Sequence, residues 1–182
     1  GDSQIMKKFL ALLFVLTLGL NAVAFAADSP VLTNPPVVSE VVDSAGNPLW
    51  VILQYNEQSL NELDAVAKSV AEGKTELEHF ALSEEDTAKL EALELDLAAL
   101  SVDELLHVTV GGYTEKPESV TFKATFTVPY EVGTKVAVLM GVGAAPGPYQ
   151  WTAEEGVVNE DGTVTVTLTD FPEEPFLLSI LS

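Results

Sequence analysis

The spacing of the hydrophobic residues changes near His107, and this change constrains the fold more than any other feature of the sequence. Downstream of it, residues 120–128 alternate apolar and polar side chains, with Phe122 and Phe126 expected inside and Thr125 in water. Four more segments of strand character follow, with short turns and no intervening helix: 135–142, 149–158, 163–169 and 176–181. Successive strands of this kind favour an antiparallel sheet or sandwich.

A β-hairpin is predicted at the start of the folded part. Residues 37–42 are apolar and β-branched, 44–48 form a turn, and 49–55 resume as a strand. This second strand is apolar on both faces, so both faces are expected to be covered. Trp50 is therefore expected in the core.

Two amphipathic helices are predicted between this hairpin and the later strands. Ser59 opens a capping box, and an apolar stripe continues over 60–72 until Gly73. Ser83 is followed by three acidic residues, which favour a helix start, and a leucine stripe extends to Leu100. Both helices are expected to dock on the sheet face that carries Trp50, and a second capping box at Ser101 predicts one further turn.

Together these patterns predict an α+β fold, namely an antiparallel β-sandwich or sheet with two amphipathic helices inserted after the first hairpin. The predicted single domain spans 37–182. Residues 27–36 contain three prolines and are predicted to form a Pro-rich leader. A chain of this length can bury a core without covalent staples, which agrees with its lack of cysteine.

Residues 6–26 have the features of a signal peptide. Lys7 and Lys8 precede an apolar run, and Ala24 and Ala26 supply the small residues that a signal peptidase requires. Cleavage is expected after Ala26, which predicts a secreted, extracellular protein. Association with the cell surface after secretion is a second option. No long apolar run follows, so no stable membrane insertion is expected after cleavage.

The charge of the chain excludes several classes of partner. Eight lysines, no arginine and 28 acidic residues give a formal net charge of −20. Nucleic acid binding requires a basic face, so no nucleic acid partner is expected. The missing arginines also argue against sites that grip phosphate or carboxylate groups in a bidentate manner.

No catalytic motif stands out, and the sequence predicts a protein that is not an enzyme. A hydrolytic triad would need His79 or His107 as its base, and neither has a serine or aspartate at a diagnostic spacing. A small secreted hydrolase remains a distant alternative, because a fold can pair carboxylates without any sequence signature. The segment 159–162 is interpreted as a turn rather than a calcium loop, and no metal or cofactor is expected.

The strand region resembles a module of secreted and cell-surface proteins of Gram-positive bacteria. The likeness covers 37–181 and rests on a strand ending at Pro129, a buried strand ending at Leu139, then Trp151, an Asp-Gly-Thr-Val-Thr segment at 161–165, and Pro175-Phe176 near the end. The last strand departs from the Ser-Pro-Phe-Ala-Ile-Val pattern of that family. The resemblance implies a non-catalytic β-rich module whose ligand is unassigned.

The function expected from these observations is a non-enzymatic extracellular or cell-surface interaction module, with a glycan or another surface protein as its partner. The alternative is a carbohydrate-binding module that uses exposed aromatic side chains. Tyr149 and Trp151 are its candidate ligand-binding residues, because they share one face of a strand after a Pro-rich loop. Packing at the end of the sheet is the competing interpretation of this pair.

Overall fold

The computed structural model describes residues 34–182, and the predicted signal peptide at 6–26 and the leader up to residue 33 lie outside the described residues. The strands are β1 Val37–Asp43, β2 Trp50–Gln54, β3 Val102–Gly111, β4 Ser119–Thr125, β5 Ala137–Val142, β6 Gln150–Val158, β7 Val164–Thr169 and β8 Phe176–Leu181. The helices are α3 Glu57–Ala71 and α4 Glu84–Glu91, with 3₁₀ turns η1 Leu77–Phe80 and η2 Leu97–Ala99. The α+β class, the antiparallel sheet and the two helices after the first hairpin are thus confirmed.

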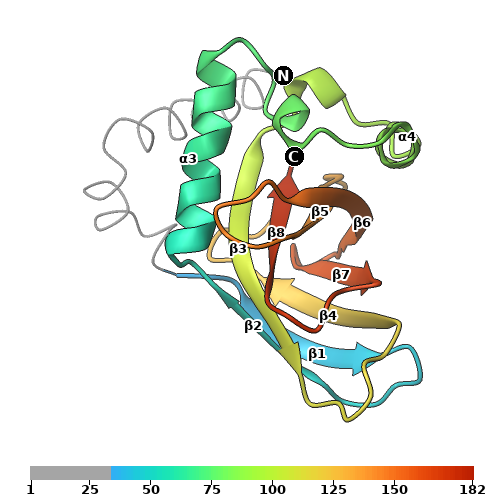
Figure 1. Ribbon diagram of the computed structural model, residues 1–182. Coiled ribbons are helices and arrows are strands. Elements are labelled where there is room, and N and C mark those ends of the chain that lie inside the picture. The colour runs from blue at the N-terminus through green and yellow to red at the C-terminus, as the bar shows by residue number, and fades with distance from the viewer. Residues whose placement is uncertain (1–33) are drawn as a thin grey trace.

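All eight strands belong to one antiparallel sheet, in the order β1-β4-β7-β6-β5-β8-β3-β2. The two outermost strands, β1 and β2, are the arms of the first hairpin. They are joined by a bridge between Val42 and Pro48 and by the Leu49 N–H, which donates to the Val41 carbonyl at 3.1 Å. The sheet therefore curls back on itself into a nearly closed, barrel-like form (Figure 1).

Hydrophobic side chains fill both sides of the sheet wall. The inner cluster includes Phe122, Leu106 and Phe176, each at most 1 % exposed. A second cluster lies on the outer side of the sheet, where Val66 of α3 and Phe80 of η1 join strand residues such as Leu177. The helices therefore cover one outer face of the sheet, and the barrel interior is a separate core (Figure 1).

The first helix begins earlier than its sequence suggests. Its N-cap is Asn56, whose side chain accepts from the Ser59 N–H, while the Ser59 hydroxyl accepts from the Asn56 N–H, both at 2.9 Å. Ser59 is therefore the third helical residue of a reciprocal capping box and not the cap itself. In the sequence either Asn56 or Ser59 could be the N-cap, and in the structure Asn56 takes that position.

The second helix is shorter than predicted. It ends at Glu91, Glu94 has a positive φ of 61°, and the chain resumes as the short turn η2. The apolar residues of the predicted stripe still pack in or against the outer cluster, although the chain after Glu91 is no longer α-helical. The turn predicted at Ser101 is also wrong: Ser101 and Ser182 exchange backbone hydrogen bonds, and β3 starts at Val102.

Two residues predicted to be inside are exposed. Trp50 is 48 % exposed, although the sequence predicts it in the core, because Val51 and Leu53 turn inward and α3 shares a core cluster with the start of β3, whereas Trp50 pairs with Gly111 at its end. Ile52 is 50 % exposed on the same side. The alternation of β4 stops at Thr125, which leaves Val128 79 % exposed.

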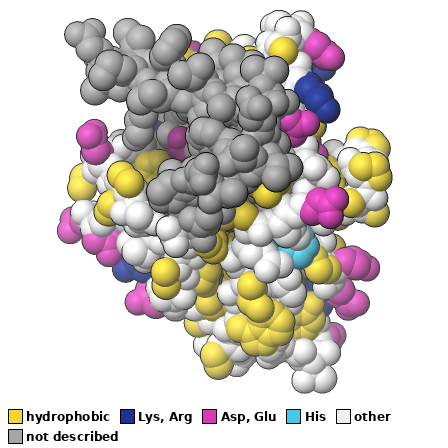
Figure 2. All heavy atoms as spheres, turned by 90° about the vertical axis from the view of Figure 1, so that its left-hand side faces the viewer, with side chains coloured by type: hydrophobic (Ala, Val, Ile, Leu, Met, Phe, Trp, Pro, Cys, Tyr) yellow, Lys and Arg dark blue, Asp and Glu magenta, His cyan; other side chains and the backbone are white. Residues whose placement is uncertain are grey.

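Figure 2 shows the side of α3 and β2, where hydrophobic side chains gather in the lower part of the view, over the strands. Among residues 34–182, no helix is long and apolar enough to cross a membrane.

Candidate functional site

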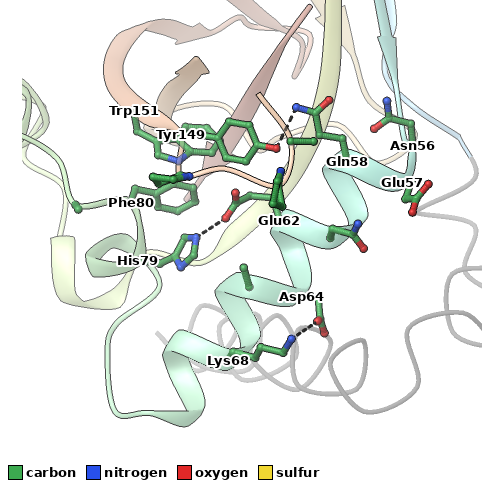
Figure 3. Close-up of a pocket in the computed structure, with 16 residues that line it drawn as sticks. Asn56, Glu57, Gln58, Glu62, Asp64, Lys68, His79, Phe80, Tyr149 and Trp151 are labelled. Atoms are coloured by element: carbon green, nitrogen blue, oxygen red, sulfur yellow. Dashed lines mark hydrogen bonds and ion pairs between the residues drawn. The ribbon is translucent and has the colours of Figure 1, made fainter. Parts of the chain in front are cut away.

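A groove of about 870 Å³ runs between α3 and the loop that connects β5 to β6. Its walls come from the exposed side of α3, from η1, and from the prolines and aromatic residues around the start of β6 (Figure 3). The lining residues are Asn56, Glu57, Gln58, Asn61, Glu62, Asp64, Ala65, Lys68, His79, Phe80, Ala81, Ala145, Pro146, Pro148, Tyr149 and Trp151. This volume lies in the range of small-molecule sites.

Both sequence-predicted site residues line this groove, but they have different environments. Trp151 is 6 % exposed and packs edge-on against Phe80, with ring centroids 4.7 Å apart. Tyr149 is half-buried, and its ring lies 6.3 Å from that of Trp151. Trp151 therefore backs the groove wall, while Tyr149 reaches toward α3 (Figure 3).

Tyr149 is tied to the first turn of α3. Its hydroxyl oxygen accepts a hydrogen bond from the Gln58 side-chain N–H at 3.0 Å. The O–H proton of Tyr149 and the side-chain amide oxygen of Gln58 remain without a partner among the described residues. This pair presents one donor and one acceptor to a molecule in the groove.

A hydrogen-bonded relay joins three side chains, two of which, Glu62 and His79, line the groove. His79 Nε2 lies 2.7 Å from Glu62 Oε1, and His79 Nδ1 lies 2.7 Å from the Ser69 hydroxyl. A carboxylate only accepts, so Nε2 carries the proton in this contact. The relay joins η1 to α3 and fixes the Glu62 carboxylate, whose side chain is only 9 % exposed.

The order of these groups is that of a Ser-His-Glu triad, yet its surroundings do not suit acyl transfer. Ser69 lies in the last turn of α3 and is not among the groove-lining residues. A nucleophile also needs hydrogen-bond donors aimed at a developing oxyanion, whereas the N–H groups of a helix are already bonded along its axis. We interpret the relay as a brace between two elements. His107 lies in mid-strand on β3, with Nδ1 3.3 Å from Gln54 Nε2, and takes no part in the groove.

Ion pairing in the groove leaves little free charge on its walls. Asp64 Oδ2 lies 3.1 Å from the Lys68 ammonium, one helical turn away. Lys68 is the one lysine among the lining residues. Glu57 and Asn61 are exposed at the rim.

A second polar cluster lies at one end of the barrel, next to the start of α3. Tyr55 donates to the Glu104 carboxyl group, and Tyr130 donates to Asp103 at 2.8 Å. Burial raises the pKa of Glu104 to about 8, and the neighbouring charge of Asp103 acts in the same direction. Burial, followed by the charge of Glu104, raises the pKa of Tyr55. None of these groups lines the groove.

No metal-binding group of three or more His, Cys, Asp or Glu side chains occurs within residues 34–182. The segment 159–162 is a turn, with Gly162 at a φ of 82° and Asn159 bonded to the backbone of Thr163.

Comparisons of the chain with protein-family models, with curated proteins and with solved structures find no match. The site is therefore interpreted from its own geometry.

Sequence reasoning did not identify the α3 side of the groove. The relevant signal is the polar stripe at Gln58, Asn61 and Asp64, which repeats at three-residue spacing opposite the apolar stripe of the helix. Such a stripe resembles an ordinary solvated helix face. It becomes one side of a groove only because the β5–β6 loop lies opposite it.

Proposed function

We propose that this protein is a non-enzymatic interaction module that acts outside the cell and binds its ligand in the groove between α3 and the β5–β6 loop. The observation that carries the proposal is the groove itself, which combines a half-buried aromatic ring with amide and carboxylate groups from a single helix. Binding sites with few, fixed polar groups on an aromatic wall are typical of ligand recognition.

Rigid support favours binding at this place. The Glu62–His79 contact, the Gln58–Tyr149 hydrogen bond and the burial of Trp151 hold both walls in position. A preformed site loses less conformational entropy on binding than a mobile one.

The location outside the cell rests on the sequence. The predicted signal peptide and the resemblance to Gram-positive surface modules both point there, and the strongly acidic surface suits a well-hydrated exported protein. N-terminal sequencing of protein recovered from culture medium should begin at Ala27. Recovery with residues 6–26 retained would argue against export by this route.

The ligand site can be tested without knowing the ligand. Asn61→Trp places a large ring at the groove rim, and Ala71→Trp places the same ring on an exposed position of α3 outside the groove. Fluorescently labelled protein is incubated with purified Gram-positive cell walls, and the retained fraction is measured. We expect retention of the wild type and of Ala71→Trp, and a loss of at least about tenfold for Asn61→Trp.

Equal retention of both variants would show that the groove is not the site. No retention of the wild type would overturn the cell-surface function.

A further inference from the structure

The chemistry of the groove narrows the ligand class further, and this step rests on the proposed function. We propose that the groove binds a neutral oligosaccharide, with Tyr149 as its stacking residue and the side chains of Gln58, Asn61 and Glu62 as its hydrogen-bonding groups. Each of these four side chains lines the groove.

The hydrogen-bonding groups that remain available are mixed donors and acceptors. The Asn61 side chain has no hydrogen bond to any described residue, so its amide offers both an acceptor oxygen and two donor protons. Glu62 uses Oε1 for His79, and its Oε2 has no hydrogen-bond partner within the described part of the chain. A sugar hydroxyl can donate and accept hydrogen bonds. Sugars therefore fit this mixed set of groups better than a ligand that only donates or only accepts.

Charge argues against ionic ligands of either sign. An anionic ligand would meet three carboxylates and one lysine already paired with Asp64, in a chain of net charge −20 without arginine. A cationic ligand would find two of the three carboxylates already engaged, Glu62 by His79 and Asp64 by Lys68, and the third, Glu57, exposed to water at the rim. A neutral ligand is not repelled by the carboxylates as an anion would be. It also does not have to compete with His79 and Lys68 for them, as a cation would.

The aromatic wall supplies apolar contact in the right place. Tyr149 stands on the loop side of the groove, opposite the amides of α3, and it is held by Gln58 (Figure 3). The apolar faces of sugar rings pack against aromatic rings, while their hydroxyl edges seek hydrogen bonds. A pyranose ring that stacks on the Tyr149 ring and bonds to side chains of α3 would satisfy both requirements.

The test is calorimetric titration of the protein with neutral tetrasaccharides (cellotetraose, maltotetraose and chitotetraose), with anionic tetragalacturonate and with cationic spermine. We expect at least one neutral tetrasaccharide to bind, with a Kd on the order of 10⁻³ M or tighter, and no comparable binding of the two charged ligands. Tyr149→Ala should weaken binding by roughly tenfold or more, and Tyr149→Phe by less, because the ring remains.

Two further variants separate binding from folding. Gln58→Ala removes a surface amide without touching either core and should also weaken binding. Trp50→Ala removes an exposed ring outside the groove and should leave affinity unchanged. Unfolding midpoints are measured for all four variants, so that a loss of affinity is scored only in folded protein.

The proposal is overturned if no neutral tetrasaccharide binds, if spermine or tetragalacturonate binds more tightly, or if Trp50→Ala loses affinity while Tyr149→Ala does not. A negative sugar titration together with lost cell-wall retention in Asn61→Trp would reject this ligand class and keep the groove as the site. Retention by Asn61→Trp would instead reject the proposed function.

Discussion

Two tryptophans occupy matching positions in the sheet and have opposite environments. Trp50 lies across β2–β3 from Gly111, and Trp151 lies across β5–β6 from Gly141. Each indole covers its glycine so closely that a Cβ added there would lie within 2.0 Å and 2.8 Å of ring atoms, respectively. Only Trp151 is then also covered by a helical layer, through Phe80.

This difference predicts unequal costs of truncation. Trp151→Ala should lower the free energy of unfolding by about 3–5 kcal/mol, because it leaves a cavity in the outer cluster. Trp50→Ala should cost about 1 kcal/mol, the typical value for a residue that is already half in water. Denaturant midpoints measure both, and similar losses for the two variants would mean that Trp151 is not buried as described.

Glu104 predicts a pH dependence of stability. Its pKa is raised from 4.5 to about 8 in the folded protein, mainly by burial. Between these pH values the folded state therefore holds a proton that the unfolded state has released, and stability falls as pH rises, by up to about 1.4 kcal/mol per pH unit. The contribution is fully present below pH 4.5 and is lost above pH 8.

Glu104→Gln supplies the control for this prediction. The amide cannot ionise, and its oxygen can still accept from Tyr55. Unfolding midpoints measured from pH 4.5 to 8 should fall for the wild type and fall less steeply for the variant. Parallel pH profiles would show that Glu104 is not the group responsible.

At the scale of elements, the capping box predicts coupling between Asn56 and Ser59. Each side chain satisfies the backbone N–H of the other. Removal of either side chain should cost about 1 kcal/mol of unfolding free energy. The double variant should cost less than the sum of the two, because losing either hydrogen bond loosens the turn that positions the other. A double-mutant cycle of Asn56→Ala and Ser59→Ala measures this coupling, and strict additivity would contradict the reciprocal arrangement.

The elements also show what the sequence could and could not predict. The strand β8 lies where it was predicted, at 176–181, because every residue in it is buried and its neighbours on both sides are strands. The end of α4 was missed, since the leucines at 93 and 97 keep a helical spacing although the chain leaves the helix at Glu91. The spacing of apolar residues shows which side chains are buried in a core. A helix and an irregular segment that bury the same side chains therefore give the same spacing.

The candidate site was half predictable. Tyr149 and Trp151 were identified because aromatic residues next to a Pro-rich loop are distinctive in sequence. Their partners on α3 are about 90 residues away in the chain, and only tertiary folding places Gln58 against Tyr149. The exposure of Trp50 was missed for a related reason: strand alternation identifies the two faces of β2 but not how far α3 extends over the outer one.

At the scale of the whole molecule, the nearly closed sheet separates its inner core from the proposed binding groove. The barrel interior holds the larger aromatic core, while the groove lies outside it, on the layer formed by α3 and the β5–β6 loop. Changes on the groove side of α3, such as Gln58→Ala, should therefore alter binding and leave the free energy of unfolding within about 0.5 kcal/mol of the wild type. A large loss of stability in that variant would mean that Gln58 supports one of the two cores.

The central claim is that ligand binds between α3 and the β5–β6 loop, and two-dimensional NMR of ¹⁵N-labelled protein tests it most directly. During titration with the neutral tetrasaccharide of highest affinity, the backbone amide signals of Gln58, Asn61 and Tyr149 should shift, while those of Trp50 and Ile52 on the exposed apolar face of β2 stay in place. Shifts confined to Trp50 and Ile52, with the groove signals unmoved, would contradict the account.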